Sequence, residues 1–72
     1  MTGGTDPRRY VRVYRELSAM LASRDLDHGD RVDIGVMADR FDVSRPTISH
    51  ALRLLESDGK VTRYDGVGWV VN

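Results

Sequence analysis

The chain has 72 residues, no cysteine and no net charge at neutral pH. This length suits one small domain that buries only about 60% of the surface its unfolded chain exposes, and the lack of cysteine excludes disulfides and thiolate metal sites. No apolar run approaches the roughly 20 residues of a membrane span, and the N-terminus lacks the apolar segment of a signal peptide, so we expect a cytoplasmic domain with no membrane partner.

The charges are unevenly spread along the chain. Residues 1–24 carry an excess of three positive charges, residues 25–42 an excess of four negative charges, and residues 43–72 an excess of one positive charge. Nucleic-acid-binding domains often have a strong basic excess, which this chain lacks. Any contact with DNA must therefore come from the local placement of basic side chains, with the acidic middle segment turned away.

The N-terminal part predicts a short leader followed by a helix. We expect residues 1–7 to form a disordered leader before a domain over residues 8–72, although Pro7 also suits a first helical turn. Apolar side chains then recur at three- and four-residue steps, which predicts an amphipathic helix that ends near Ser23. This stripe consists of Tyr10, Val13, Tyr14, Leu17 and Leu21. Four arginines lie largely off the stripe, and we favour simple solvation over phosphate contact for them: Arg8, Arg9, Arg12 and Arg15.

A polar turn and a second helix come next. The segment RDLDHGD predicts the turn, with Leu26 reaching the core, and RVD is short enough for one small strand. A calcium loop is excluded, because the sixth and twelfth positions counted from Asp25 lack the required glycine and glutamate. Asp33 can cap the second helix. The buried face of that helix is predicted from four residues at helical spacing: Ile34, Met37, Ala38 and Phe41.

The third helix is predicted over residues 45–57, after a three-residue break at DVS. Ser44 can cap it through the backbone amide of Thr47, Pro46 is tolerated in a first turn, and Gly59 ends it. At about 100° per residue, one side of the helix is apolar and the opposite side is polar. The apolar side holds Ile48, Ala51, Leu52 and Leu55, and the polar side holds Pro46, Ser49, His50, Arg53 and Ser57.

The last segment predicts a hairpin over residues 61–71, because KVTRY and WVV flank the turn sequence DGVG. The expected fold class is therefore mainly α with a small β wing, in which three helices and a β-hairpin form a winged helix-turn-helix. A helix, a tight turn and a second helix with a polar outer face form the helix-turn-helix pattern. Such a helix fits the major groove and presents its N-terminal residues to base edges. We expect Trp69 and the tyrosines to pack in the core or at its edge.

From about Tyr10 to Val71 the chain resembles the winged helix-turn-helix DNA-binding domain of prokaryotic GntR-type transcriptional regulators. The resemblance rests on Y..V...L...L....L..GDRV, on VSRPTISHALRLLESDGKV and on DGVGWVV. It implies that residues at the start of the third helix contact DNA, and that the wing tip approaches the minor groove. The matching positions are Ser44, Arg45 and Thr47, then Ser49 where the family often has arginine, and Gly66 and Gly68 in the wing.

The chain also departs from the family pattern. The family's Pro-Ser-Glu-Arg segment at the second helix is replaced by a segment, VDIGV, that is one residue shorter. The phosphate contacts of that serine and arginine are therefore not carried over. Val67 stands at the wing tip where a basic or polar residue is common, and Lys60 stands where an apolar residue is usual. We accordingly expect weaker phosphate contact than is usual in the family.

The expected DNA-binding set combines the start of the third helix with the wing. Arg45 leads the set, because a cation at a helix N-terminus opposes the helix dipole and its fork suits phosphate or a guanine edge. Thr47 and Ser49 carry short hydroxyls that suit several bases or phosphate. For His50, an exposed side chain without a DNA contact is the favoured interpretation. For Arg53 and Arg63, a DNA contact and an ordinary solvated position are equally supported. The full set is Ser44, Arg45, Pro46, Thr47, Ser49, His50, Arg53, Arg63, Gly66, Val67 and Gly68.

The predicted function is the regulation of transcription, and we expect a repressor that binds double-stranded DNA as two copies on an inverted repeat. No enzyme activity, metal or cofactor is expected, because the sequence holds no phosphate-binding glycine loop, nucleophile elbow or zinc signature. Two alternatives remain open. One is a winged-helix protein-interaction module, such as an anti-repressor or adaptor, and the other is the N-terminal fragment of a larger ligand-responsive regulator.

Overall fold

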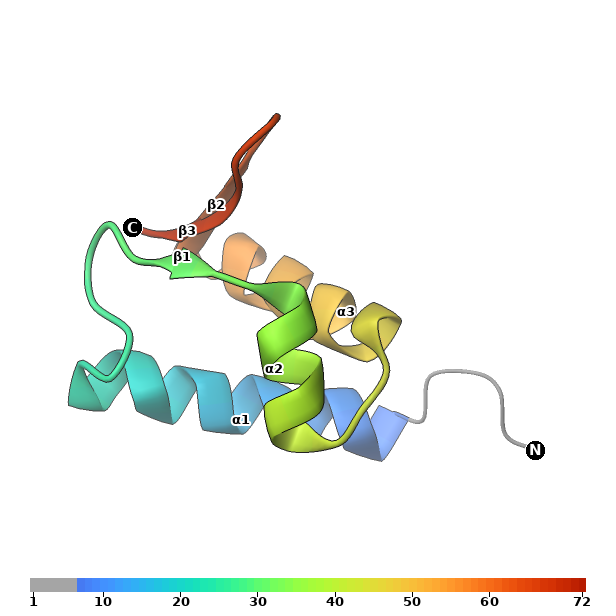
Figure 1. The fold of residues 1–72 in the computed structure, drawn as a ribbon. Coiled ribbons are helices and arrows are strands. Elements are labelled where there is room, and N and C mark those ends of the chain that lie inside the picture. Colours follow the sequence, from blue (N-terminus) through green and yellow to red (C-terminus); the bar gives the residue numbers. More distant parts are fainter. Residues whose placement is uncertain (1–6) are drawn as a thin grey trace.

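The computed structural model describes residues 7–72, and residues 1–6 of the expected leader lie outside the described residues (Figure 1). Pro7, which we placed both in the leader and in a first helical turn, is the first residue of a helix. No helix of the described part is long and apolar enough to cross a membrane. The elements follow in the predicted order: α1 (Pro7–Ser23), β1 (Arg31–Val32), α2 (Ile34–Phe41), α3 (Arg45–Ser57), β2 (Val61–Tyr64) and β3 (Gly68–Val71).

The core lies where α1 packs on α3, and α2 completes it (Figure 1). Val13 and Leu17 on α1 are fully buried, as the predicted stripe requires. The apolar side predicted for α3 is confirmed, since each of its four residues has at most 1% of its surface exposed: Ile48, Ala51, Leu52 and Leu55. Leu26, in the turn after α1, also reaches the core as expected.

Local capping fixes where α2 begins and ends. The carboxylate of Asp33 accepts a hydrogen bond from the backbone amide of Val36 at 3.0 Å, which confirms it as the N-cap. Asp42 then adopts a left-handed conformation with φ of 55°, and the amide of Val43 donates to the carbonyl of Ala38 at 3.0 Å. This closure turns the chain sharply, so that only residues 42–44 separate α2 from α3.

The end of α3 is a Schellman motif, in which two amides beyond the helix bond back to its last carbonyls. The amide of Lys60 donates to the carbonyl of Leu55, and the amide of Gly59 donates to that of Glu56, both at 2.9 Å. Gly59 has φ of +76°, a conformation that glycine adopts without steric cost. The predicted stop at Gly59 is therefore confirmed.

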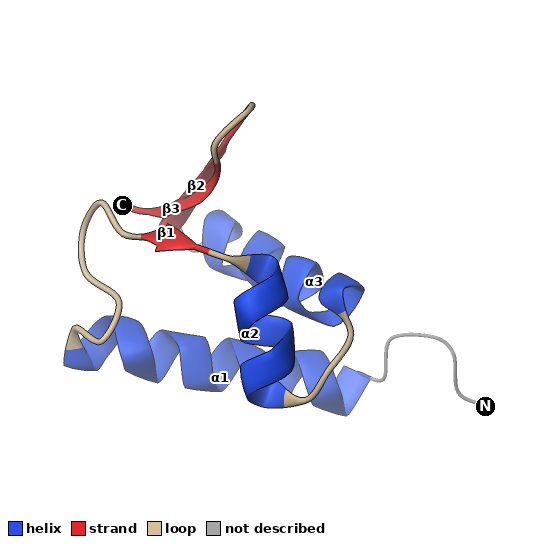
Figure 2. Ribbon diagram, viewed as in Figure 1, coloured by secondary structure: helices blue, strands red, loops and turns tan. Residues whose placement is uncertain are grey.

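The hairpin belongs to a three-stranded antiparallel sheet with the order β1-β3-β2. Figure 2 shows the sheet beside one end of the helices, with the tip of the hairpin pointing away from them. Val32 pairs with Trp69, and this pairing ties the start of α2 to the wing. Trp69 is buried as predicted, but Tyr64 is 52% exposed and does not pack in the core. Its strand extends beyond the helices, so no element covers it.

The packing of α3 on α1 generates a stability prediction. Leu52→Ala should lower the free energy of unfolding by about 2–5 kcal/mol, because it leaves a cavity beneath a fully buried side chain. Urea unfolding followed by Trp69 fluorescence measures this loss. The control is Leu54→Ala, a half-buried leucine of the same helix, which should cost clearly less. Equal losses for the two variants would contradict the described orientation of α3.

Candidate nucleic-acid interface

The outward side of α3 begins at its first turn and carries most of the expected contact residues. Arg45, Pro46 and Arg53 are exposed, and Ser49 is half-buried. Together with Ile34 of α2 these four side chains line a hollow of about 480 Å³. The structure thus brings the start of α3 and the start of α2 onto one surface.

Arg45 lies against the backbone of α2. Its Nη2 atom is 3.3 Å from the point that a Cβ atom of Gly35 would occupy. Within residues 7–72 the Arg45 side chain makes no hydrogen bond or ion pair. No function was predicted for Gly35, although a glycine inside a helix costs up to about 1 kcal/mol relative to alanine and can mark the close approach of another group. Gly35 leaves the room in which the guanidinium of Arg45 lies.

Ser44 and Thr47 form the cap of α3. The Ser44 hydroxyl accepts a hydrogen bond from the Thr47 amide at 3.3 Å, which confirms the predicted N-cap. The two hydroxyl oxygens are 2.8 Å apart and share a hydrogen bond. Thr47 is only 2% exposed, so the expectation that its hydroxyl is offered to DNA is corrected. Because Thr47 lies three residues after the cap, its side chain folds back over Ser44, and we assign it to holding the start of the helix.

His50 is in contact with α1 rather than freely exposed. Its ring stacks on that of Tyr10 with centroids 4.0 Å apart and an angle of 24° between the planes. Farther along, the Tyr14 hydroxyl donates a hydrogen bond to the Asp58 carboxylate, which is the largest cause of the raised pKa of Tyr14. These contacts join α1 to the middle of α3 and to the residue that caps its C-terminal end. His50 is thus half-buried and not an ordinary exposed histidine, and its contact with DNA stays a prediction.

The wing carries the remaining residues of the expected set. Gly66 and Gly68 have φ of +78° and +108°, so both are needed for the turn. Val67 at the tip is 48% exposed, and Arg63 on β2 is exposed as well. Val67 and Gly68 line a small hollow of about 190 Å³ with residues 31–35. Because Ile34 also lines the hollow beside Arg45, the wing and the start of α3 belong to one continuous surface.

The acidic segment divides into two parts. Asp25, Asp27 and Asp30 lie in the loop after α1, which is at the opposite end of the molecule from the turn that begins α3 (Figure 1). This agrees with the expectation that acidic groups face away. Asp33 and Asp42 do not follow it, because they cap the two ends of α2, next to the expected interface. Among residues 7–72, no group of three His, Asp or Glu side chains could hold a metal ion.

The three helices, the three-residue turn and the wing define a winged helix-turn-helix domain of the DNA-binding type, which confirms the predicted fold class. Residues 9–71 match the family described as bacterial regulatory proteins, gntR family. The chain therefore belongs to the GntR family, and the resemblance of its motifs is confirmed.

Three known proteins illustrate the similarity. The uncharacterized HTH-type transcriptional regulator YdhC of Bacillus subtilis (strain 168) is 34% identical over 62 residues, which are 86% of this chain but 28% of YdhC. The DNA-binding domain of AraR in complex with operator ORR3 has a TM-score of 0.82 at 26% identity, covering 89% of this chain and 78% of that one. The possible transcriptional regulator YydK from Bacillus subtilis subsp. subtilis str. 168 has a TM-score of 0.77 at 28% identity, covering 88% and 28%. The chain thus spans less than a third of YdhC.

The cap of α3 generates the second prediction. Ser44→Ala should destabilise the fold by about 1–2 kcal/mol, because it removes the N-cap and leaves the buried Thr47 hydroxyl without its partner. The measurement is the free energy of unfolding in urea. Ser49→Ala is the matched control, since Ser49 is on the outer side of the same helix, and its change should stay within about 0.5 kcal/mol. A neutral Ser44→Ala variant would show that the cap does not set the start of α3.

Proposed function

We propose that this chain is a sequence-specific double-stranded DNA-binding domain that regulates transcription in the cytoplasm, and that it acts as a repressor. In this proposal α3 enters the major groove and the wing approaches the minor groove. The observation that carries it is Arg45, an exposed cation at the N-terminus of α3 without a hydrogen bond or ion pair in residues 7–72.

The chemistry of Arg45 favours an anionic or guanine partner. A cation in the first turn of a helix is opposed by the partial positive charge of the helix N-terminus. The Asp33 carboxylate lies nearby, with its Oδ1 atom also 3.3 Å from the Cβ position of Gly35, but it forms no ion pair with Arg45, so the guanidinium stays available to a ligand outside the domain. The guanidinium fork can bond two acceptors at once, which suits the O6 and N7 atoms of guanine or two phosphate oxygens. The backbone of Gly35 supports the side chain beside α2.

The neighbouring residues extend this contact along α3. Pro46 and Ser49 share the hollow with Arg45 and would lie at base edges or flanking phosphates, and Arg53, one turn later, would meet the backbone. A reading helix must be held rigidly to discriminate between bases. The fully buried apolar side of α3 provides that support.

The wing supplies a second, weaker contact in this proposal. Gly66 and Gly68 shape a tip that can approach the minor groove, and Arg63 on β2 can reach a phosphate. Val67 at the tip adds no charge, so the affinity should depend mainly on α3. One small module reads few base pairs, and we therefore propose two copies on an inverted repeat. The AraR domain, which has the same fold, has been solved with its operator, and this likeness supports the docking.

Selection from a random duplex pool at low salt, followed by sequencing, tests the proposal. The expected result is enrichment of one motif arranged as an inverted repeat. Enrichment of a single half-site would support DNA binding but would reject the arrangement of two copies on an inverted repeat. No enrichment by the folded protein would reject sequence-specific binding and favour the protein-interaction alternative, for which the exposed Val67 and Tyr64 of the wing form the relevant surface.

The role of Arg45 generates the third prediction. Arg45→Ala should weaken binding to the selected sequence by about 1–3 kcal/mol and relax the preference at one base position. Fluorescence anisotropy with the selected duplex and its single-base variants measures both effects. Arg40→Ala is the control, because Arg40 is an exposed arginine that lines a hollow with Glu16, Met20 and Phe41, on another side of α2. Wild-type affinity and preference in the Arg45 variant would show that the assigned docking is wrong.

A further inference from the structure

The glycine inside α2 is not required by the conformation of the backbone. Gly35 lies within the helix and does not have the positive φ that explains the glycines of the turns, such as Gly59 and Gly66. Within a helix, glycine is less favourable than alanine, because it gives the unfolded backbone more freedom. What distinguishes this position is therefore the space that a side chain would fill.

Two charged groups border that space. A Cβ atom on Gly35 would lie 3.3 Å from the Nη2 atom of Arg45 and 3.3 Å from the Oδ1 atom of Asp33. Both distances are shorter than an ordinary van der Waals contact, so a neighbour would have to move by a few tenths of an ångström. The Asp33 carboxylate is held by the Val36 amide at 3.0 Å. The guanidinium is the end of a long side chain that makes no hydrogen bond or ion pair within residues 7–72, so it is the group that moves.

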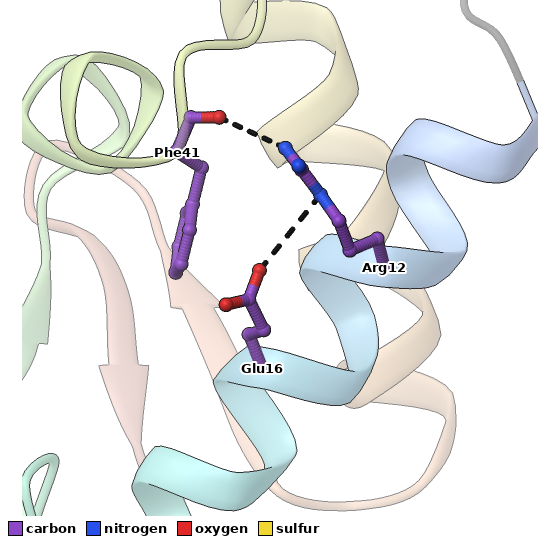
Figure 3. Close-up of polar contacts among 3 residues, drawn as sticks. All are labelled: Arg12, Glu16 and Phe41. Carbon is purple, nitrogen blue, oxygen red and sulfur yellow. Dashed lines mark hydrogen bonds and ion pairs between the residues drawn. The ribbon is translucent and has the colours of Figure 1, made fainter.

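The helix α2 itself is held near both ends. Just before its first residue, Val32 pairs with Trp69 of β3. At its last residue, the Phe41 carbonyl accepts a hydrogen bond of 2.9 Å from the Nη2 atom of Arg12, whose Nε atom is 3.8 Å from a carboxylate oxygen of Glu16 (Figure 3). Arg12, which was expected only to be solvated, thus also ties α1 to α2. A side chain added in the first turn of α2 therefore displaces the guanidinium rather than the helix.

The confinement of the guanidinium bears on recognition. Arg45 lines the hollow at the start of α3, and Ile34 of α2 lines it as well. An arginine side chain loses rotamer freedom when it binds, and confinement beforehand reduces that loss. A two-point contact with a guanine edge also requires the fork to keep its plane and direction. The space at Gly35 thus bears on which base Arg45 reads, and not only on how strongly it binds.

We propose that Gly35 is a positioning residue for base recognition. It carries no side chain, so the guanidinium of Arg45 lies against α2 in the orientation that reads one base pair. The inference rests on the proposed function and adds to it a residue of α2 that determines specificity through Arg45. Stability and recognition make opposite demands at this position, because alanine would favour the helix while its Cβ atom would push the guanidinium aside.

The test is a double-mutant cycle over Gly35→Ala and Arg45→Ala. Affinity for the selected duplex and for its single-base variants is measured by fluorescence anisotropy, and stability by urea unfolding. Gly35→Ala should leave the urea midpoint unchanged or higher, because alanine fits the helix. It should bind the selected duplex about threefold to tenfold more weakly, which is less than loss of the whole arginine contact, with a weaker preference at one base pair. In the Arg45→Ala background, Gly35→Ala should change neither affinity nor preference.

Val36→Ala is the matched control. Val36 is the next residue of α2, is 59% exposed and lines neither the hollow beside Arg45 nor the hollow beside the wing. This variant should keep the wild-type affinity and preference.

Three outcomes would overturn the role of Gly35 and leave the proposed function intact. One is wild-type affinity and preference in Gly35→Ala. Another is an equal loss of affinity with and without the Arg45 side chain, since Gly35 would then not act through it. The third is a clearly lower urea midpoint for Gly35→Ala, which would show that the fold yields and not the guanidinium. Wild-type protein that enriches no duplex would overturn the proposed function and this inference with it.

Discussion

The burial of one side of α3 against α1 is the constraint on which the rest of the domain depends. Ile48, Leu52 and Leu55 have at most 1% of their surface exposed, and they meet the equally buried Val13 and Leu17. Burial of each such side chain contributes about 1.5–3 kcal/mol, a large share of the stability of a domain this small. A rotation of α3 by one residue, about 100°, would expose this side. The outer side, with Arg45 and Ser49, is therefore fixed in direction before any ligand is present.

The chain has no net charge, and the proposed interaction with DNA therefore depends on where its charged side chains lie. The carboxylates of Asp25, Asp27 and Asp30 lie in a loop at the far end of the molecule from the start of α3. Of the two aspartates nearer the interface, Asp33 uses its carboxylate to cap α2, whereas Asp42 ends that helix through its backbone conformation. A screening length of about 8–10 Å at physiological salt limits how far the distant acidic loop can weaken a phosphate contact. The phosphate backbone of a bound duplex would therefore interact with the local charge of the interface and not with the net charge of the chain.

Most of the fold could be predicted because its signals are local. Asp33 and Ser44 bond to amides three residues ahead, Gly59 relieves a left-handed turn, and the apolar stripes follow the helical period. Much of the site could not be predicted, because it depends on contacts across long sequence separations. Thr47 was expected at the surface and is buried, and His50 was expected on the outer face and stacks on Tyr10. A helical projection gives the direction of a side chain, but it does not give the residue of another element that packs against that side chain.

The sequence by itself determined the elements, their caps, the tight turn between α2 and α3, and membership of the GntR family, since each of these depends on residues within one turn or on a recurring motif. Only the tertiary structure decided which polar groups of α3 stay available. It brought Gly35 beneath the guanidinium of Arg45, paired β1 with β3, and set the first turn of α1 beside the start of α3. The physical reason is that availability depends on what the rest of the chain covers, and that is known only once the helices have packed.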